Sequence, residues 1–506
     1  MDLTLSLAES PSRFRFPFPA LWVGLLTAHA AASLHVAISN QAMFRKMQSL
    51  AAAGYLTVPG GAAMPALTAP ASAVWGGLFF TLTVGAFLVW VSLSAGIAWH
   101  RMYGGARAFL LLCLLFWAGL FFMVNEAGFA GWNNLHLIVT PPITFALAAR
   151  HSRTMPPAED VGSRLAIHLV CLGLLAAIGM GMTDAALFSR IRDRLLLHPA
   201  GVAISNFYYR YTLYPAETFK APAQKQIRGV HLDPSLPAAL SRRLGTVLAA
   251  RDYLPIKYQE AVDLRMSGDT ETLHFVQGDR TILRISTHQF FADPQTVLRD
   301  YSRSVDRHGG LRQLTFLSLR IVGGLLLYGL LYLPFRWIGG VFFSPVRAAA
   351  VAGLLGCGAA ALLLVGLQQA PPNRIAPDQV QTALSNGSTE MRVAALRRLL
   401  HRGIDIAGFE GYAALATSPN VAERYWLAKA LRHSQSQTSW PVHLALLEDP
   451  QINVAYNAYA SLGFRGDPRG IAEIRRRLPA EPRWYVQFYA YRALRRLGWR
   501  PSPVSN

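Results

Sequence analysis

Cysteine is scarce in this sequence. Only three cysteines occur in 506 residues, and each of them, Cys113, Cys171 and Cys357, falls inside a long apolar run. The polar regions contain none. A disulfide framework and a metal site built from paired cysteines are therefore both excluded.

Acidic residues are also few, since 28 Asp and Glu stand against 48 Lys and Arg, which gives a formal net charge of +20. Such an excess would suggest nucleic acid as the partner of a soluble protein. Here the arginines flank apolar runs, so we expect them to face anionic lipid headgroups. We therefore expect these arginines to contact a lipid bilayer, and we do not expect the protein to bind nucleic acid.

Common catalytic and cofactor motifs are missing as well. The sequence contains no glycine-rich phosphate-binding loop, no HExxH or CxxC pair, no dinucleotide-binding fingerprint and no serine nucleophile elbow. The signatures of nucleotide-dependent enzymes, zinc proteases and serine hydrolases are thus absent. No motif in the sequence indicates a cofactor.

Long apolar runs are what the sequence has in plenty. Hydrophobic residues make up 52% of the chain and concentrate in the N-terminal third and in residues 313–367. Because about 20 apolar residues cross the core of a bilayer, this distribution predicts a mainly α-helical, multi-pass membrane protein. The fourth span is the weakest, because it is short and contains Pro141 and Pro142. The seven expected spans are 17–38, 74–98, 107–124, 135–149, 165–187, 314–335 and 346–367.

Arginines between the spans predict an orientation. They precede the first span and occupy alternate connections, whereas the 125–134 gap has neither Lys nor Arg. The positive-inside rule then makes the N-terminus cytoplasmic and places loop 39–73, the gap, the 188–312 insert and the C-terminal region outside. Arginine greatly exceeds lysine and alanine is abundant, which favours a GC-rich bacterial genome. We therefore expect a bacterial inner-membrane protein with periplasmic domains.

Two further features of the apolar runs leave alternatives open. The first run, ending near Ala28-His29-Ala30, also fits a cleavable signal peptide, and the later arginines predict the same orientation either way. In the fifth span, small residues every four positions predict close helix packing. We expect that packing within the chain, with an oligomer contact as the alternative, along Gly173, Ala177 and Gly181.

The stretch MVNEAGFAGWNNLHLIVTPP (123–142) gathers polar side chains at the expected outer boundary of the membrane. Ionisable groups at such depth are costly unless they are paired, so they are functional candidates. Glu126 and His136 are the candidate acid–base pair for a lipid-linked or anionic substrate. The plainer alternative is that these residues cap helices and form a turn. Binding candidates at the same depth are Asn125, Asn133, Asn134, His35 and Asp184.

Histidines within the apolar runs suggest a further alternative, a b-type haem or a quinone site. Two axial histidines would have to lie on facing helices at matching depth. His35 and His136 meet the depth condition, but no helix carries the paired histidines of a two-haem bundle.

The insert at 188–312 predicts an α+β domain. Its segment NFYYRYTLYPAETF (206–219) is typical of an aromatic belt at a membrane interface. Alternatively it binds a substrate, with Tyr208, Arg210 and Tyr211 as candidates. Apolar and polar residues alternate around two Gly-Asp turns in 261–287, which predicts a three-stranded antiparallel meander. Helices are expected at 237–250 and 294–307.

The C-terminal region contains an internal repeat. SPNVAERYWLAKAL (418–431), DPQINVAYNAYASL (449–462) and EPRWYVQFYAYRAL (481–494) each carry a proline and, twelve positions later, a leucine. A weaker copy, NGSTEMRVAALRRL (386–399), precedes them. Such a period predicts a solenoid of helix pairs. The pattern resembles the short HEAT-like repeats also found in phycobilin lyases, and the resemblance implies a docking surface for a protein partner but no lyase activity.

The sequence therefore predicts four regions: a five-span bundle (1–187), an extracytoplasmic α+β insert (188–312), two further spans (313–370) and a HEAT-like solenoid (376–506). We expect a scaffold or subunit of an envelope complex that docks a partner protein. The alternatives are a membrane-embedded enzyme that uses Glu126 and His136 at the outer leaflet, and the haem or quinone site.

Overall fold

The computed structural model describes residues 17–154, 161–182, 185–211, 217, 219–257, 262–368 and 375–502. The chain is mainly helical with one small sheet, and it divides into two compact units. Unit 1 comprises Met1–His35, Gly77–Asp184 and Arg307–Gln369. Unit 2 comprises Val36–Gly76, Ala185–Asp306 and Ala370–Asn506. Each unit is thus assembled from segments that are far apart in the sequence.

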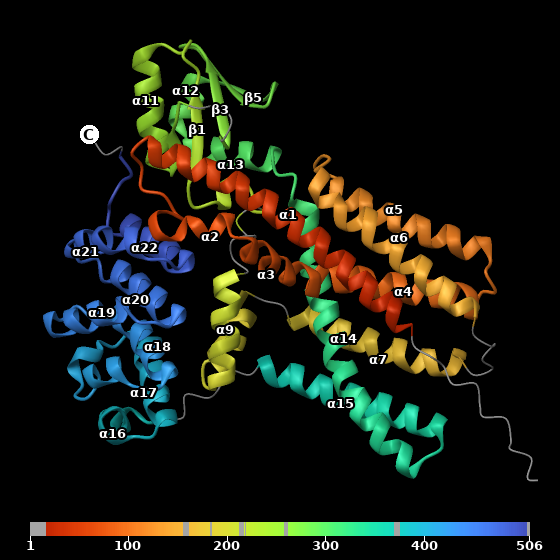
Figure 1. The fold of residues 1–506 in the computed structure, drawn as a ribbon. Coiled ribbons are helices and arrows are strands. Elements are labelled where there is room, and N and C mark those ends of the chain that lie inside the picture. The colour runs from red at the N-terminus through yellow and green to blue at the C-terminus, as the bar shows by residue number, and fades with distance from the viewer. Residues whose placement is uncertain are drawn as a thin grey trace, which may run out of the picture. The chain divides into compact units, whose positions relative to one another are not determined.

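Unit 1 is built from long apolar helices (Figure 1). Two of the helices, α1 and α3, have residues in both units. A π-helical stretch, Thr81–Gly85, joins α3 to α4. The bounds are α1 (Phe18–Ala52), α3 (Pro70–Phe80), α4 (Ala86–Arg101), α5 (Arg107–Asn125), α6 (Gly131–Arg153), α7 (Val161–Met182), α14 (Gly309–Phe342) and α15 (Pro345–Gln368).

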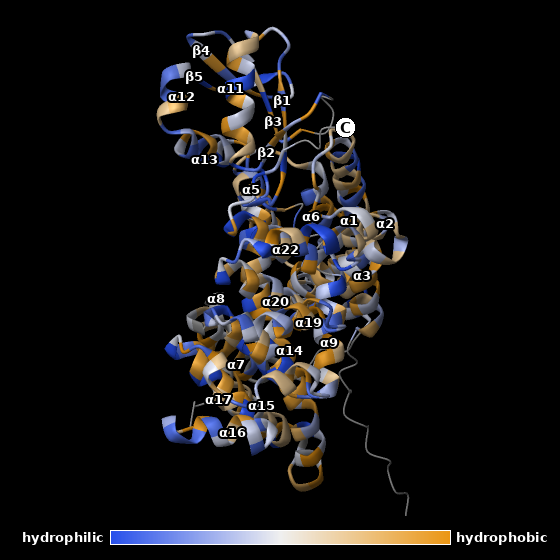
Figure 2. Ribbon diagram, turned by 90° about the vertical axis from the view of Figure 1, so that its left-hand side faces the viewer, coloured by the Kyte–Doolittle hydropathy of each residue, from blue (hydrophilic) through white to orange (hydrophobic). Residues whose placement is uncertain are grey.

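Most of the expected spans correspond to apolar helices, whose hydrophobic residues are orange in Figure 2. The expected span at 165–187 contains a shorter apolar helix, Ile167–Gly181. The expected span at 135–149 lies within α6, which contains two prolines and is less apolar. Within the described residues, five helices are long and apolar enough to cross a membrane: Phe18–Ala52, Pro70–Arg101, Arg107–Asn125, Gly309–Phe342 and Val346–Gly366.

Glycines let α6 approach its neighbours closely. A Cβ atom added at Gly96 of α4 would lie 2.7 Å from the backbone oxygen of Phe145 on α6. A Cβ atom added at Gly24 of α1 would lie 2.5 Å from Oγ1 of Thr144, also on α6. Helix α6 is therefore packed tightly against both α1 and α4, which fixes the positions of the polar residues at its start.

The small-residue stripe of α7 makes no close contact with the described part of the chain. Its members are exposed, and within the described residues nothing lies within 4 Å of a Cβ atom added at either glycine of the stripe. The packed face of α7 instead carries Cys171 and Leu175, which join a buried cluster with Tyr328 of α14. Among the described residues the predicted packing of the stripe within the chain is therefore not found, and another face of α7 is buried instead. The stripe consists of Gly173, Ala177 and Gly181.

Unit 2 contains a mixed five-stranded sheet in the order β2-β1-β3-β4-β5 (Figure 1). Strand β1 pairs in parallel with β2 and β3, whereas β3, β4 and β5 pair antiparallel. The meander expected within 261–287 is therefore confirmed. The strands are β1 (Arg228–Leu232), β2 (Tyr253–Pro255), β3 (Leu264–Gly268), β4 (Thr272–Gln277) and β5 (Arg280–Ser286).

Both helices that the sequence predicts for this region are present, and they pack against the sheet. The helices expected at 237–250 and 294–307 are α11 (Ala238–Ala249) and α13 (Pro294–Ser304), and a short helix α12 (Thr287–Ala292) follows β5. Leu244 of α11 and Tyr301 of α13 belong to the same buried cluster as Phe275 of β4. This cluster is the core of the α+β part.

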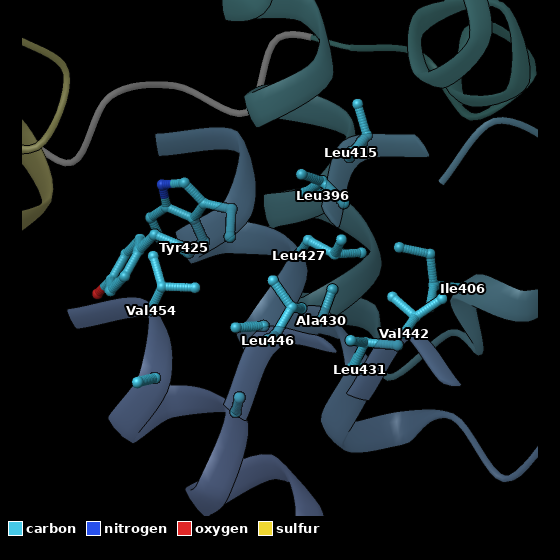
Figure 3. Close-up of a cluster of buried hydrophobic side chains, with 14 of the residues drawn as sticks. Leu396, Ile406, Leu415, Tyr425, Leu427, Ala430, Leu431, Val442, Leu446 and Val454 are labelled. Atoms are coloured by element: carbon cyan, nitrogen blue, oxygen red, sulfur yellow. The ribbon is translucent and has the colours of Figure 1, made fainter. Parts of the chain in front are cut away.

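The C-terminal helices stack as repeats. The four leucines that recur in the sequence all have 0% of their surface exposed, namely Leu399, Leu431, Leu462 and Leu494. Figure 3 shows Leu427 and Ala430 of α18 among the side chains of neighbouring helices, including Leu396 and Leu446. Each repeat therefore buries its apolar face on the next. The helices are α16 (Val380–Asn386), α17 (Thr389–Arg402), α18 (Val421–Ala430), α19 (Trp440–Leu447), α20 (Ile452–Arg465), α21 (Arg469–Arg477) and α22 (Trp484–Arg496).

Helices α8 (Ala185–Leu195) and α9 (Pro199–Tyr211) pack on these repeats. The ring of Tyr209 on α9 lies 4.7 Å from that of Tyr485 on α22, measured between centroids. Nδ2 of Asn453 on α20 donates a 2.8 Å hydrogen bond to Oγ of Ser205 on α9. The start of the insert thus belongs with the repeats, and the sheet begins further along the chain.

The segment after α1 also joins the repeats. It contains a 3-10 turn (Gly61–Ala63) and a short helix α2 (Pro65–Thr68). The side chain of Gln487 on α22 accepts a hydrogen bond from the amide of Gly60 and donates one to its carbonyl, both at 2.9 Å. On the same helix, the hydroxyl of Tyr491 donates to Asp252, which precedes β2, at 2.8 Å. Helix α22 therefore connects the repeats to both other parts of unit 2.

Candidate functional site

A layer of buried polar side chains lies within unit 1 at the start of α6. Asn125, the last residue of α5, and Asn134 of α6 exchange two side-chain hydrogen bonds of 2.6 and 2.7 Å. Each amide also donates to a backbone oxygen, that of Phe121 or that of Ala130. Because both amides are saturated, this pair fastens α5 to α6 and offers little to a ligand.

Asn133 fastens α6 to the start of α14. Its Nδ2 donates to the backbone oxygen of Arg307 at 3.3 Å, and its side chain lies 3.0–3.1 Å from Nδ1 of His308. His308 is the N-cap residue of α14, and Asn133 is fully buried. The asparagines of the 125–134 gap are therefore brought together with α14, and their contacts are structural.

His35 of α1 and His136 of α6 are buried neighbours. Their ring centroids lie 6.2 Å apart, and the ring planes are inclined by 51°. They are 3% and 2% exposed. Within the described part of the chain, Nδ1 of His136 is buried without a hydrogen-bond partner. The two imidazoles can hold a proton or contribute two nitrogen ligands to a metal.

Glu126 does not join this pair. It occupies the C-cap position of α5, and its side chain is exposed. Among the described residues no hydrogen bond or ion pair connects Glu126 to His136, whose neighbour is His35 instead. The acid–base pair expected from the sequence is therefore not assembled, because one member is solvent-exposed and the other is buried in a helix contact. Asp184 lies outside the described residues.

The binding residues expected in 206–219 do not converge on one site. Tyr208 is exposed, and the guanidinium of Arg210 lies 5.5 Å from the ring centroid of Tyr211. Tyr211 in turn neighbours the ring of Trp75 on α3, at 6.4 Å. The tyrosine that makes the close contacts is Tyr209, which packs on the repeats. Only its spacing of four positions from Ser205, on the same helix face, could have indicated this.

Two charged residues of α8 also contact the repeats. The hydroxyl of Tyr425 on α18 donates a 2.6 Å hydrogen bond to Oδ1 of Asp193. Nη1 of Arg192 donates to the hydroxyl of Tyr456 on α20 at 2.8 Å. Lys429 of α18 lies 3.9 Å from Oδ2 of Asp193. Sequence reasoning missed these residues, because no local motif marks a contact across more than two hundred positions.

No set of three His, Cys, Asp or Glu side chains suited to a metal ion occurs among the described residues. The arrangement therefore offers two kinds of site. One is the pair of histidines in unit 1. The other is the surface of the repeats, part of which is in contact with side chains of α8 and α9.

Comparison with known proteins identifies the repeats. Residues 412–495 match the family model of HEAT repeats. No curated protein and no solved structure matches the chain. The C-terminal part of this chain is therefore a HEAT-repeat region, as its leucine period predicted.

Proposed function

We propose that this protein is a scaffold of a bacterial inner membrane, in which the apolar helices are the anchor and unit 2 docks a partner protein in the periplasm. The observation that carries the proposal is the composition of unit 2, where HEAT repeats are joined with an α+β part in one compact body. HEAT repeats generally mediate protein–protein interaction. The periplasmic side follows from the arginines between the apolar runs.

The division into units is consistent with one side of the membrane for all three segments of unit 2. Val36–Gly76, Ala185–Asp306 and Ala370–Asn506 share one unit, so an even number of membrane crossings has to separate each from the next. Of the seven expected spans, four lie between the first and second segments and two between the second and third. Both numbers are even. The arginine pattern, which is independent of the packing, also predicts a common side for the three segments, and it alone favours the periplasm.

The internal contacts of unit 2 suit a scaffold. The hydrogen bonds of Gln487 with Gly60, of Tyr491 with Asp252 and of Asn453 with Ser205 each join parts of unit 2 that are remote in sequence. Side-chain clusters held in this way lose little freedom when a partner binds, which favours affinity. The enzyme alternative has less support, because Glu126 and His136 lie in different environments.

The paired histidines favour a second candidate, a transition-metal or b-type haem site. Two imidazoles bound on opposite sides of one metal at about 2 Å each have ring centroids roughly 6 Å apart, close to the 6.2 Å between His35 and His136. An absorption spectrum and a metal analysis of the purified protein test this candidate. A Soret band or a stoichiometric metal that disappears in His136→Ala supports it, and the absence of both from the wild-type protein rejects it.

The scaffold is tested in intact cells by site-specific photo-crosslinking. Deletion of the repeats is unsuitable, because α22 supports the rest of unit 2. A photoreactive residue is placed instead at the exposed positions Met391 and Ile404 of the repeats, with exposed Leu362 of α15 as the control. We expect one discrete adduct from the repeats, whose partner also co-purifies with the wild-type chain in mild detergent. Scaffolding is rejected if neither repeat position yields a protein adduct at normal chain levels.

A further inference from the structure

Cationic side chains lie over aromatic rings along several consecutive repeats. Nζ of Lys429 lies 4.0 Å from the ring centroid of Trp426. The ring of Phe464 is contacted by two guanidinium groups, with Arg432 at 4.4 Å and Arg496 at 3.9 Å. We call the following set the cationic stripe: Arg397, Lys429, Arg432, Arg492 and Arg496.

Like charges are crowded along the stripe. The pKa of Lys429 is lowered to about 8, mainly by burial; the charge of Asp193 opposes this effect, and nearby arginines, including Arg432, add to it. Burial and then the charge of Arg496 lower the pKa of Arg432, and burial and then Arg492 lower that of Arg496. Each member is thus close enough to repel the next, which makes the unliganded stripe electrostatically unfavourable.

The carboxylates of the repeats do not relieve this repulsion. Asp449 pairs with Arg424 at 2.6 Å, Glu481 pairs with Arg483 at 2.6 Å, and other carboxylates are likewise taken by arginines outside the stripe. Among the described residues, no ion pair reaches the three arginines Arg432, Arg492 and Arg496. The stripe therefore carries positive charge without an internal counterion at that end.

At the other end, the chain itself supplies a carboxylate. Asp193 of α8 accepts a hydrogen bond from Tyr425 and lies 3.9 Å from Lys429. This contact demonstrates that the surface of the repeats accommodates an acidic side chain between a cation and an aromatic donor. The remainder of the stripe also has cations beside rings, and there the exposed Phe464 offers an apolar surface in place of a hydroxyl donor.

We propose that the cationic stripe binds an acidic, extended segment of a partner protein, whose carboxylates contact Arg432, Arg492 and Arg496 while an apolar side chain covers Phe464. This proposal rests on the scaffold function and names the chemistry of the docked partner. Guanidinium groups pair with carboxylates in a bidentate manner, and stacking on a ring holds the guanidinium plane in place. Arginine and aromatic residues are also enriched in the cores of protein interfaces.

The depth of the cations favours a peptide over a membrane surface. Arg432 and Lys429 are only partly exposed, whereas Arg492 and Arg496 are exposed. A peptide side chain can reach recessed and protruding cations in turn, whereas a flat layer of phosphate headgroups reaches only the protruding ones. The cations come from α17, α18, the 3-10 turn after α18 and α22, and Phe464 of α20 lies between Arg432 and Arg496. This series from one repeat to another likewise suits a linear ligand.

The test measures binding of a short fluorescein-labelled peptide, rich in Glu and with one central Leu, to the full-length protein in neutral nanodiscs. A matched peptide with Gln in place of Glu is the ligand control. The stripe variant is Arg432→Gln with Arg496→Gln. The protein control is Arg475→Gln with Arg476→Gln, which removes the same charge from exposed positions of α21.

We expect the stripe variant to raise the Kd for the Glu peptide at least about tenfold, and the α21 variant to change it less than about threefold. Equal losses in both variants, or equal binding of the Gln peptide, overturn the proposal. Binding to vesicles that contain phosphatidylglycerol but not to the Glu peptide overturns it in favour of lipid. If the stripe variant keeps the cellular adduct formed at Met391, the stripe proposal is wrong and scaffolding stands.

Discussion

The side chain of Gln487 closes a buried two-hydrogen-bond contact with the backbone of Gly60, accepting from its amide and donating to its carbonyl. Gln487 is fully buried, and the same Nε2 also donates to the carbonyl of Glu481 at 2.7 Å. One side chain of the last repeat thus satisfies the backbone polar groups of a loop near the other end of the chain.

Replacement of Gln487 by Ala tests this contact. The substitution leaves buried backbone groups without partners, and each such group costs about 1–3 kcal/mol. We expect unit 2 to lose roughly 2–4 kcal/mol of stability, with early proteolysis in the loop around Gly60. Thermal unfolding and limited proteolysis measure the effect. Gln437→Ala, at an exposed position, is the control, and equal melting temperatures for the two variants would contradict the role of Gln487.

Asp263 makes the stability of unit 2 depend on pH in the acidic range. Its buried carboxylate contacts Lys46 at 2.8 Å and Lys225 at 2.9 Å. Burial raises the pKa of Asp263, but the two lysines lower it by more, so that it falls below its ordinary value of 3.8. Such a carboxyl contributes stability that is present above pH 3.8 and is lost as the pH falls towards the lowered pKa.

Asp263→Asn removes the carboxylate that pairs directly with the partly buried Lys46 and Lys225. We expect a loss of about 3–5 kcal/mol at neutral pH, and a smaller further loss than in the wild-type protein when the pH falls below about 4. Thermal unfolding at neutral and acidic pH measures both effects. Asp300→Asn, at an exposed position, should change neither quantity. A variant that unfolds with the wild-type profile at every pH would refute the assignment.

Two substitutions in the polar region at the start of α6 distinguish a structural role of its residues from a catalytic one. Asn134→Ala leaves the amide of Asn125 without its reciprocal partner, and we expect a loss of about 1–3 kcal/mol. Glu126→Gln alters an exposed group, and we expect a change within about 0.5 kcal/mol and unaltered cellular function. Unfolding of both variants in detergent and a growth or assembly assay measure the outcomes. Loss of function in a fully stable Glu126→Gln protein would revive the enzyme alternative.

The proposed orientation is tested with single cysteines in a chain that lacks Cys113, Cys171 and Cys357. Thr68→Cys, Arg280→Cys and Arg475→Cys sample the three segments of unit 2 at exposed positions, and Ala106→Cys samples the connection between α4 and α5. We expect a membrane-impermeant maleimide to label the first three in cells with a permeabilised outer membrane, and the fourth only after lysis. Labelling of Ala106→Cys together with any of the others in intact inner membranes would refute the orientation.

Local and periodic features of the fold could be predicted from the sequence. Leu399, Leu431, Leu462 and Leu494 recur because each packs in an equivalent place, and this repetition is visible without a structure. The β-meander followed from alternation around two turns. In both cases the pattern and the contact it encodes lie within a few tens of residues.

Contacts between distant segments could not be predicted in this way. The sequence placed Asn125 and Asn134 in one layer but gave no sign that they bond to each other. For His136 it offered both Glu126 and His35 as partners at similar depth, and it could not show that His35 is the neighbour. The depth of a residue along a helix can be counted from the sequence, whereas the direction it faces depends on how the helices are rotated and packed. For the same reason the association of α8 and α9 with the repeats was not foreseen.

The hydrogen bond between Gly60 and Gln487 spans 427 positions, and this separation has a consequence for biosynthesis. The loop around Gly60 leaves the ribosome when most of the chain is still unmade, and it has to wait for α22 before its apolar residues, such as Val58, are covered. Contacts between such remote residues form late in folding, and until then apolar surface that promotes aggregation stays exposed. Nascent chains that stop before α22 should therefore depend on chaperones or be degraded.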